Sequence, residues 1–190
     1  MTLRLQIGVA LRPLPGERMC GDAIVTHVHH GVALVAVIDG LGHGPGAARA
    51  SAAACAYIDA HRDEPLARVV EGCDRALRQT RGAVMTLIRV DPSRAILQHV
   101  AIGNVETRYR GNGDVCALTV PGVVGTRLRK VRERSFSVAP GDLFVIYTDG
   151  ISSQFDLAAL AHLPAQELAD QLLRTHAKDH DDAGCAVIRC

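Results

Sequence analysis

The chain has 190 residues, of which 48% are hydrophobic and 22% charged, and its 21 basic and 20 acidic side chains leave a formal net charge of +1. This composition argues against disorder, and the balanced charge with only six aromatic Phe or Tyr residues and no Trp argues against nucleic-acid binding. The longest apolar stretches, residues 31–38 and 50–58, are too short to span a bilayer. Six scattered cysteines without a C-x-x-C pair are typical of free thiols. We therefore expect one domain over residues 1–190 in a reducing cytoplasm, with no membrane segment.

The first half of the chain predicts three strands followed by two helices. Residues 3–11 alternate apolar and polar side chains, which is the period of a strand. Residues 23–29 and 32–38 are β-branched runs around a His-Gly pair, so they predict a hairpin. Residues 46–61 are rich in small helix-forming residues, and 66–80 carry apolar residues at helical spacing.

The second half returns to strands. The pattern predicts them over residues 83–90, 95–102, 106–110, 115–120, 130–138 and 143–148. A helix over 167–176 and a last strand over 183–189 follow. Because the connections between the strands are short, antiparallel pairing is favoured. The order of elements indicates an α+β fold in which helices cover mainly antiparallel sheets.

The most informative motif follows the apolar strand that ends at Ile38. It reads Asp39-Gly40-Leu41-Gly42-His43-Gly44, a carboxylate at the end of a core strand and three glycines within five residues. Glycines allow the backbone to approach a ligand closely. An Asp-Gly pair alone is also common in simple turns, where the Asp side chain caps the backbone.

Three further acidic positions repeat this arrangement. Asp149-Gly150 follows another apolar strand, Asp181-Asp182 precedes the last strand, and Asp22 opens the second strand. We expect these carboxylates to meet at one edge of the sheets. Grouped carboxylates repel one another, and a hard divalent cation relieves the repulsion. Oxygen donors without clustered cysteines favour Mg²⁺ or Mn²⁺ over Zn²⁺.

The ordered set of motifs resembles that of a known enzyme family. The matching pieces are Cys20-Gly21-Asp22, Asp39 to Gly44, Gly103-Asn104, Tyr147-Thr148-Asp149-Gly150 and Asp181-Asp182-Ala183. They resemble the PP2C-type (PPM) metal-dependent serine/threonine phosphatases, and within them the SpoIIE-like branch. The resemblance implies an αββα sandwich of two sheets flanked by helix pairs, in a minimal version without the mobile flap of larger relatives.

The same resemblance implies a site that binds two Mn²⁺ or Mg²⁺ ions. By motif, the metal ligands are Asp22, Asp39, the carbonyl of Gly40, Asp149 and Asp181. Asp39 would bridge both ions, and Asp39 and Asp149 would be the central catalytic carboxylates. Asp182 and Asn104 would lie behind the ligands, and Asn104 stands where many larger relatives have an Asp for a third ion. A hydroxide bridging the metals would attack the phosphorus atom.

Two residues near these motifs are candidates for a direct catalytic role. Arg18 precedes Asp22 by four residues, where larger relatives place a phosphate-binding Arg, and a guanidinium can hold two phosphate oxygens. The alternative is an ordinary loop arginine. His43 follows Asp39 by four residues and could protonate the leaving serine oxygen, although larger relatives place a His two residues after the Asp.

Two other clusters admit a plain and a functional interpretation. His27-Val28-His29-His30 invites a zinc site, but no third ligand is apparent and a solvated hairpin end is favoured. Arg127, Arg129, Arg132 and Arg134 surround Lys130. An exposed strand face is the favoured interpretation of this basic cluster, and docking to an acidic partner is the sharper one.

The resemblance implies a phosphatase acting on phosphoserine or phosphothreonine of STAS-domain proteins, either stressosome components or antagonists of anti-sigma factors. Its partners would be these phosphorylated proteins, with neither nucleic acid nor membrane. The leading alternative is a pseudophosphatase, the same fold acting as a binding module in the same signalling pathway. A nucleotide-binding glycine loop at Asp39 to Gly44 is a third interpretation, and it lacks the Lys-Ser/Thr of a phosphate loop.

Overall fold

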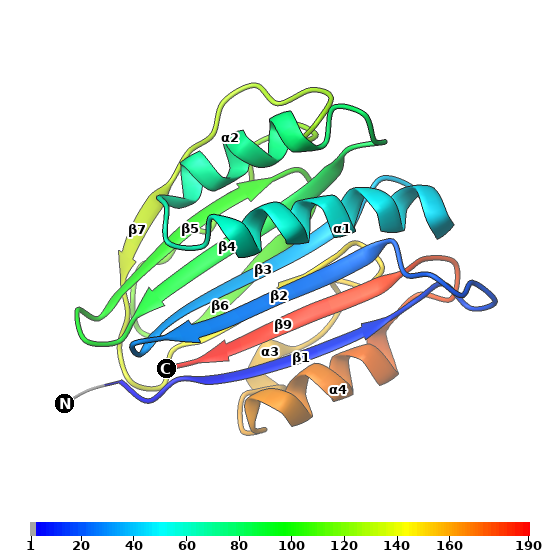
Figure 1. Ribbon diagram of the computed structural model, residues 1–190. Coiled ribbons are helices and arrows are strands. Elements are labelled where there is room, and N and C mark those ends of the chain that lie inside the picture. The colour runs from blue at the N-terminus through cyan, green and yellow to red at the C-terminus, as the bar shows by residue number, and fades with distance from the viewer. Residues whose placement is uncertain (1–2) are drawn as a thin grey trace.

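Two antiparallel sheets form the centre of the molecule in the computed structural model, which describes residues 3–190 (Figure 1). One sheet has the strand order β1 (Gln6–Arg12), β9 (Ala183–Arg189), β8 (Leu143–Tyr147), β6 (Glu106–Arg110). The other has the order β2 (Asp22–His29), β3 (Val32–Gly40), β4 (Ala83–Asp91), β5 (Ile96–Ile102), β7 (Arg134–Ser137). Every pair of neighbouring strands is antiparallel.

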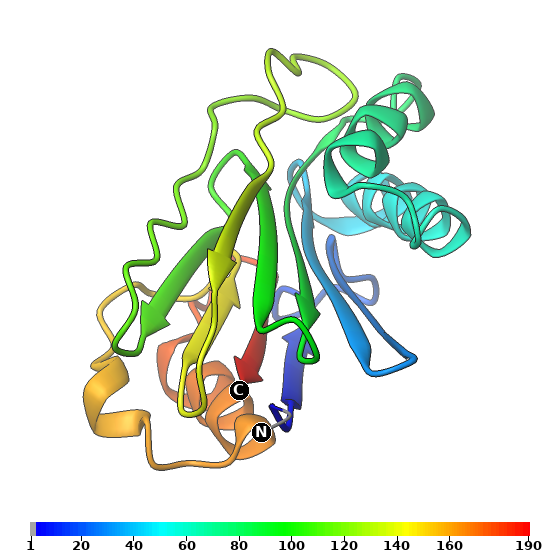
Figure 2. The same cartoon turned by 90° about the vertical axis from the view of Figure 1, so that its left-hand side faces the viewer.

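A pair of helices covers the outer face of each sheet. Helices α1 (Gly44–Ala60) and α2 (Leu66–Ala76) lie on the five-stranded sheet, and α3 (Leu157–Leu160) and α4 (Ala165–His176) lie on the four-stranded sheet. Figure 2 shows the layers edge-on. The expected α+β sandwich of two antiparallel sheets flanked by helices is confirmed.

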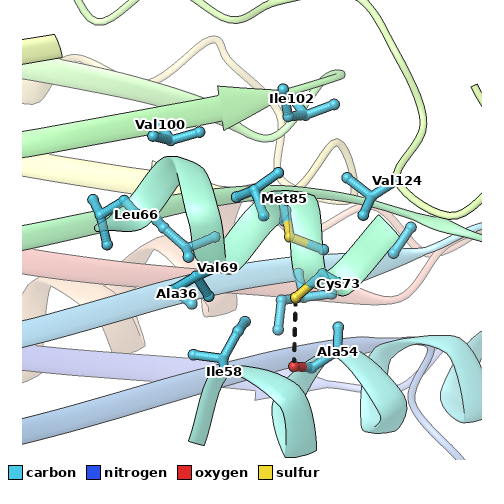
Figure 3. Close-up of a cluster of buried hydrophobic side chains, with 14 of the residues drawn as sticks. Ala36, Ala54, Ile58, Leu66, Val69, Cys73, Met85, Val100, Ile102 and Val124 are labelled. Carbon is cyan, nitrogen blue, oxygen red and sulfur yellow. Dashed lines mark hydrogen bonds between the residues drawn. The ribbon is translucent and has the colours of Figure 1, made fainter. Parts of the chain in front are cut away.

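Strand β3 shows why the sheets stack as they do. Its side chains alternate between two cores because successive residues of a strand point to opposite faces. Ala36 and Ile38 pack under α1 and α2, in the cluster that Figure 3 shows with Met85. Val35 and Val37 pack between the two sheets. Apolar residues on both faces make β3 the central strand that its sequence predicts.

Three predictions of secondary structure were wrong in part. Residues 115–120 form no strand, because only Val120 reaches the edge of the sheet, where it forms an isolated bridge with Ile102. The strand predicted over 130–138 is limited to β7, since only these four residues pair with β5. The short helix α3 was not predicted, although Asp156 caps it by accepting hydrogen bonds from Ala158 N and Ala159 N.

Candidate metal centre

Four strand ends meet at one edge of the sandwich. In the five-stranded sheet, β2 begins where β3 ends, so Asp22 and Asp39 lie directly opposite each other in the antiparallel register. In the four-stranded sheet, β8 ends beside the start of β9, which brings Asp149 and Asp181 to the same edge. A hydrogen bond joins the two sheets there, from Thr148 Oγ1 to Asp22 Oδ2 at 2.7 Å.

Asp22 is the most deeply buried of the predicted carboxylate ligands. Only 5% of its surface is exposed. Burial raises its pKa to about 7; the hydrogen bond from Thr148 opposes this rise, and the negative charges of Asp182 and Asp181 add to it. Among residues 3–190, no Lys, Arg or His nitrogen lies within 4 Å of the Asp22 carboxylate, and a buried carboxylate without a cationic partner is a setting that favours a divalent cation.

Asp39 lies at the centre of the acidic group. Burial raises its pKa to about 8, and the charges of Asp22, Asp149 and Asp181 raise it further in that order. The pKa of Asp181 is also raised, mainly by burial and then by Asp149. The negative charge of neighbouring carboxylates therefore contributes to the raised pKa values of Asp22, Asp39 and Asp181, as expected if the four strand ends meet.

A cleft of about 520 Å³ opens in front of these groups. Asp39, Asp149 and Asp181 line it together with Asn104. The amide of Asn104 donates to Asp149 Oδ2 at 2.7 Å, so Asn104 orients one of the predicted ligands from within the cleft. Gly42 and Gly103 also line the cleft, and both have positive φ angles that suit glycine.

Asp182 faces away from the cleft and holds a loop. Its side chain is 2% exposed, and its two oxygens accept hydrogen bonds from Leu14 N at 2.8 Å and Gly21 N at 2.9 Å. These bonds tie the segment before Asp22 to the start of β9. The carboxylate of Asp182 therefore fixes the position of Asp22 rather than facing a ligand.

Arg18 and His43 lie outside the residues that line the cleft. Both side chains are exposed, and His43 Nδ1 lies 3.3 Å from Glu17 Oε1. His43 also precedes α1 without capping it through its side chain. The structure thus brings the predicted carboxylates together and leaves these two candidates at the margin.

Arg81, which belongs to none of the motifs in the sequence, lies against the glycine loop and the start of α1. A Cβ added to Gly46 would lie 2.6 Å from Arg81 Nε, and one added to Gly42 would lie 3.0 Å from Arg81 Nη1. The guanidinium also approaches the carbonyl of His43, at 3.5 Å from Nη1. The loop glycines therefore make room for an arginine from the start of another strand, a role that their spacing alone cannot reveal.

The donor set fits hydrated Mg²⁺ or Mn²⁺. Among residues 3–190, no three His, Cys, Asp or Glu side chains lie close enough to enclose a metal ion by themselves. Mg²⁺ usually keeps several of its waters and binds through one or two carboxylates, so an open edge of oxygen donors suits it. Within the same residues no group of three such side chains forms around the histidines at positions 27–30, and His27 pairs with Asp59 at 2.7 Å.

Comparison with known proteins decides the family. The sequence model of the protein family described as stage II sporulation protein E (SpoIIE) matches residues 29–190 of this chain. The chain belongs to the SpoIIE family. It is therefore a PP2C-type serine/threonine phosphatase by family, as the motifs predicted.

Two individual relatives show which members of the SpoIIE family this chain is similar to. Phosphoserine phosphatase RsbX of Bacillus subtilis (strain 168) is 25% identical over 139 residues, which cover 72% of this chain and 70% of RsbX. A solved structure from work on the bacterial stressosome, a modular system adapted to control secondary messenger signaling, is 36% identical. The match covers 98% of this chain and all of that one, with a TM-score of 0.92. The chain is thus a PP2C-type serine phosphatase of the RsbX and stressosome kind.

More distant structures agree in fold. RsbX in complex with magnesium is 22% identical, with a TM-score of 0.88 over 97% of this chain and 94% of RsbX. The catalytic domain of the phosphatase PstP, in complex with two manganese ions, is 16% identical, with a TM-score of 0.75 over 97% of each chain.

Within residues 3–190, no helix of this SpoIIE-family chain is both long and apolar enough to cross a bilayer.

Proposed function

We propose that this chain removes phosphate from phosphoserine or phosphothreonine of STAS-domain proteins of the stressosome kind, acting as one catalytic domain over residues 1–190. The observation that carries the proposal is the meeting of four carboxylates at one edge of the sandwich, three of which line the cleft, while the fourth, Asp22, lies opposite Asp39 in the strand register. The likeness to a stressosome protein and to RsbX supports the class of substrate. The free cysteines of the described chain are consistent with a reducing cytoplasm.

The proposed metal ligands are those expected from the motifs: Asp22, Asp39, the carbonyl of Gly40, Asp149 and Asp181. Two Mg²⁺ or Mn²⁺ ions at this edge would supply Lewis-acid polarisation of the phosphoryl group and a nucleophile at neutral pH. Asp39 is influenced by the charges of Asp22 from its own sheet and of Asp149 and Asp181 from the other sheet. It is therefore the residue that would contact both ions. Arg18 and His43 remain candidates for phosphate binding and leaving-group protonation, and both side chains are exposed.

Two hydrogen bonds orient the proposed metal ligands. Thr148 occupies one oxygen of Asp22 and Asn104 occupies one oxygen of Asp149, which leaves the other oxygen of each carboxylate for a cation. Such hydrogen bonds fix the orientation of metal ligands before the ion binds. The cleft beside them is open rather than covered by a lid, which suits a phosphorylated residue on the surface of a folded protein.

Hydrolysis of a phosphoserine peptide and of p-nitrophenyl phosphate, with Mn²⁺, with Mg²⁺ and with chelator, tests this function. We expect metal-dependent turnover that falls by roughly a thousandfold or more in Asp39→Asn, because the variant loses transition-state stabilisation of several kcal/mol. Asp63→Asn, which removes an exposed carboxylate elsewhere, should behave like the wild type. Turnover that persists in chelator or in Asp39→Asn would contradict the proposal.

A further inference from the structure

A second groove continues from the proposed catalytic cleft along the surface. Its volume is about 350 Å³. Thr119 and Pro121 line both the groove and the cleft, so the two hollows share a wall. The other wall of the groove carries four cationic side chains, Arg129, Lys130, Arg132 and Arg134. Figure 2 shows the connection between β6 and β7 that forms it, in yellow-green, arching toward α2 and back.

The charge of this wall is not neutralised by the protein. Residues 127–134 hold five cationic side chains and one carboxylate, on a chain whose net charge is only +1. That carboxylate, Glu133, already accepts hydrogen bonds from Gln98 Nε2 and Ala67 N, both at 2.9 Å. Within residues 3–190, none of the five cations lies within 4 Å of a carboxylate oxygen.

The wall is nevertheless held in place. Leu128 and Val131 pack against the core under α2. Arg129 and Lys130 between them and Arg132 after them are exposed. On the opposite side, Val120 N donates to the carbonyl of Ala101 at 2.9 Å. A row of unpaired cations on an anchored segment is a surface that attracts negative charge without first having to fold.

We propose that this groove docks an acidic segment of the phosphorylated protein substrate, next to the phosphoserine that enters the cleft. The inference rests on the proposed function, because the groove is continuous with the cleft that would hold the phosphate. The side chains that line the cleft include three carboxylates and no cation, whereas the groove beside it carries four cations, so the groove is the surface that can hold a negatively charged segment. Charge complementarity of this kind increases the rate of association and selects partners more than it adds to affinity.

Two synthetic phosphoserine peptides of equal length test the proposal, one flanked by Asp and Glu and the other by Asn and Gln. The variant Arg129→Gln/Lys130→Gln/Arg132→Gln removes three exposed cations of the groove. The control Arg62→Gln/Arg94→Gln/Arg174→Gln removes three exposed cations elsewhere. All three enzymes should hydrolyse p-nitrophenyl phosphate equally, because none of these residues lines the cleft.

We expect the wild type and the control to hydrolyse the acidic peptide with a kcat/KM about tenfold higher than that of the neutral peptide at low salt, and the groove variant to lose this preference. The preference should also shrink in 0.5 M salt, which screens exposed charges. Equal use of both peptides by the wild type, a preference retained by the groove variant, or an equal loss in the control would overturn the proposal.

Binding separates this proposal from the proposed function. If the wild type does not hydrolyse p-nitrophenyl phosphate in the presence of Mn²⁺ or of Mg²⁺, the proposed function fails. Fluorescence anisotropy of the two labelled peptides still tests the groove in that case. Tighter binding of the acidic peptide, lost only in the groove variant, supports docking. A single-stranded oligonucleotide of equal charge that binds the groove more tightly than the acidic peptide would overturn the assignment of its occupant.

Discussion

Three of the acidic side chains at the sheet edge have one oxygen committed to a protein partner. Asp22 accepts from the Thr148 hydroxyl, Asp149 from the Asn104 amide, and Asp181 from the backbone N–H of Asp182. Each partner leaves the second carboxylate oxygen available. The side chains are thus oriented before a cation arrives, and the remaining cost is the repulsion between their charges.

Burial, together with this repulsion, predicts an unusual pH dependence for the metal-free protein. The pKa values of Asp22 and Asp39 are raised from 3.8 to about 7 and about 8. Between pH 4 and pH 8 the folded state therefore binds more protons than the unfolded state, so the contribution of these two groups to stability falls as the pH rises. We expect the melting temperature in chelator to decline from pH 6 to pH 8, and Mg²⁺ or Mn²⁺ to reverse the decline.

The variant Asp22→Asn/Asp39→Asn isolates the contribution of this pair. It should be more stable than the wild type at pH 8 in chelator, its melting temperature should depend less on pH in this range, and added metal should stabilise it less. A pH profile in chelator that runs parallel in the two proteins would show that the two carboxyls titrate normally.

At the scale of elements, the two Asp-Gly pairs require glycine because of close backbone approach. Neither Gly40 nor Gly150 has a positive φ angle. A Cβ on Gly40 would lie 2.3 Å from the carbonyl oxygen of Ala47 in α1, and one on Gly150 would lie 1.7 Å from the carbonyl oxygen of Asp182. Each glycine thus lets a neighbouring element pack directly beside a predicted ligand.

We expect Gly150→Ala to lower both stability and activity. The added methyl group must push apart the end of β8 and the start of β9, at a cost of roughly 1–3 kcal/mol of unfolding free energy. Because this movement separates Asp149 from Asp181, metal-dependent turnover should fall even at temperatures where the variant remains folded.

Gly31→Asn is the matched control for this substitution. Gly31 lies in a hairpin turn with a φ of 80°, which Asn tolerates, and nothing lies within 4 Å of an added Cβ. Thermal unfolding and initial rates should show little change in this variant. Wild-type stability and turnover in Gly150→Ala would show that the two strand ends need not lie so close.

The sequence was most informative where a pattern and a backbone requirement coincide. The apolar run before Asp39 predicted a central strand, and the repeated Asp-Gly pairs predicted strand ends at one edge. The bond from Thr148 to Asp22 could not be predicted, because it joins residues 126 positions apart in different sheets. Nor could the approach of Arg81 to the glycine loop, which depends on how β3 and β4 pair.

In the irregular segment between β6 and β7, the sequence pattern predicted a strand that the structure does not form. Residues 115–120 have the composition of a strand, but strands also need a partner, and here only Val120 reaches one. Leu118 is 56% exposed, so an apolar residue did not mean a buried one. The basic run that follows was predicted mainly as an exposed strand face. The structure makes most of it one wall of a groove, and pairing begins only at Arg134.

At the scale of the whole molecule, the candidate metal centre depends on both sheets. The five-stranded sheet supplies Asp22 and Asp39, and the four-stranded sheet supplies Asp149 and Asp181. Each sheet thus contributes two of the four carboxylates. Divalent cations should therefore bind to the folded sandwich in preference to the unfolded chain, and stabilise it by mass action.

Calorimetric titration of the metal-free protein with Mn²⁺, run in parallel on Asp39→Asn, tests the central claim most directly. We predict that about two Mn²⁺ ions bind per wild-type chain, and that at least one of these binding events disappears in the variant. Absence of Mn²⁺ binding, or the same stoichiometry and affinity in both proteins, would contradict a metal centre at this edge and favour a binding module with the phosphatase fold.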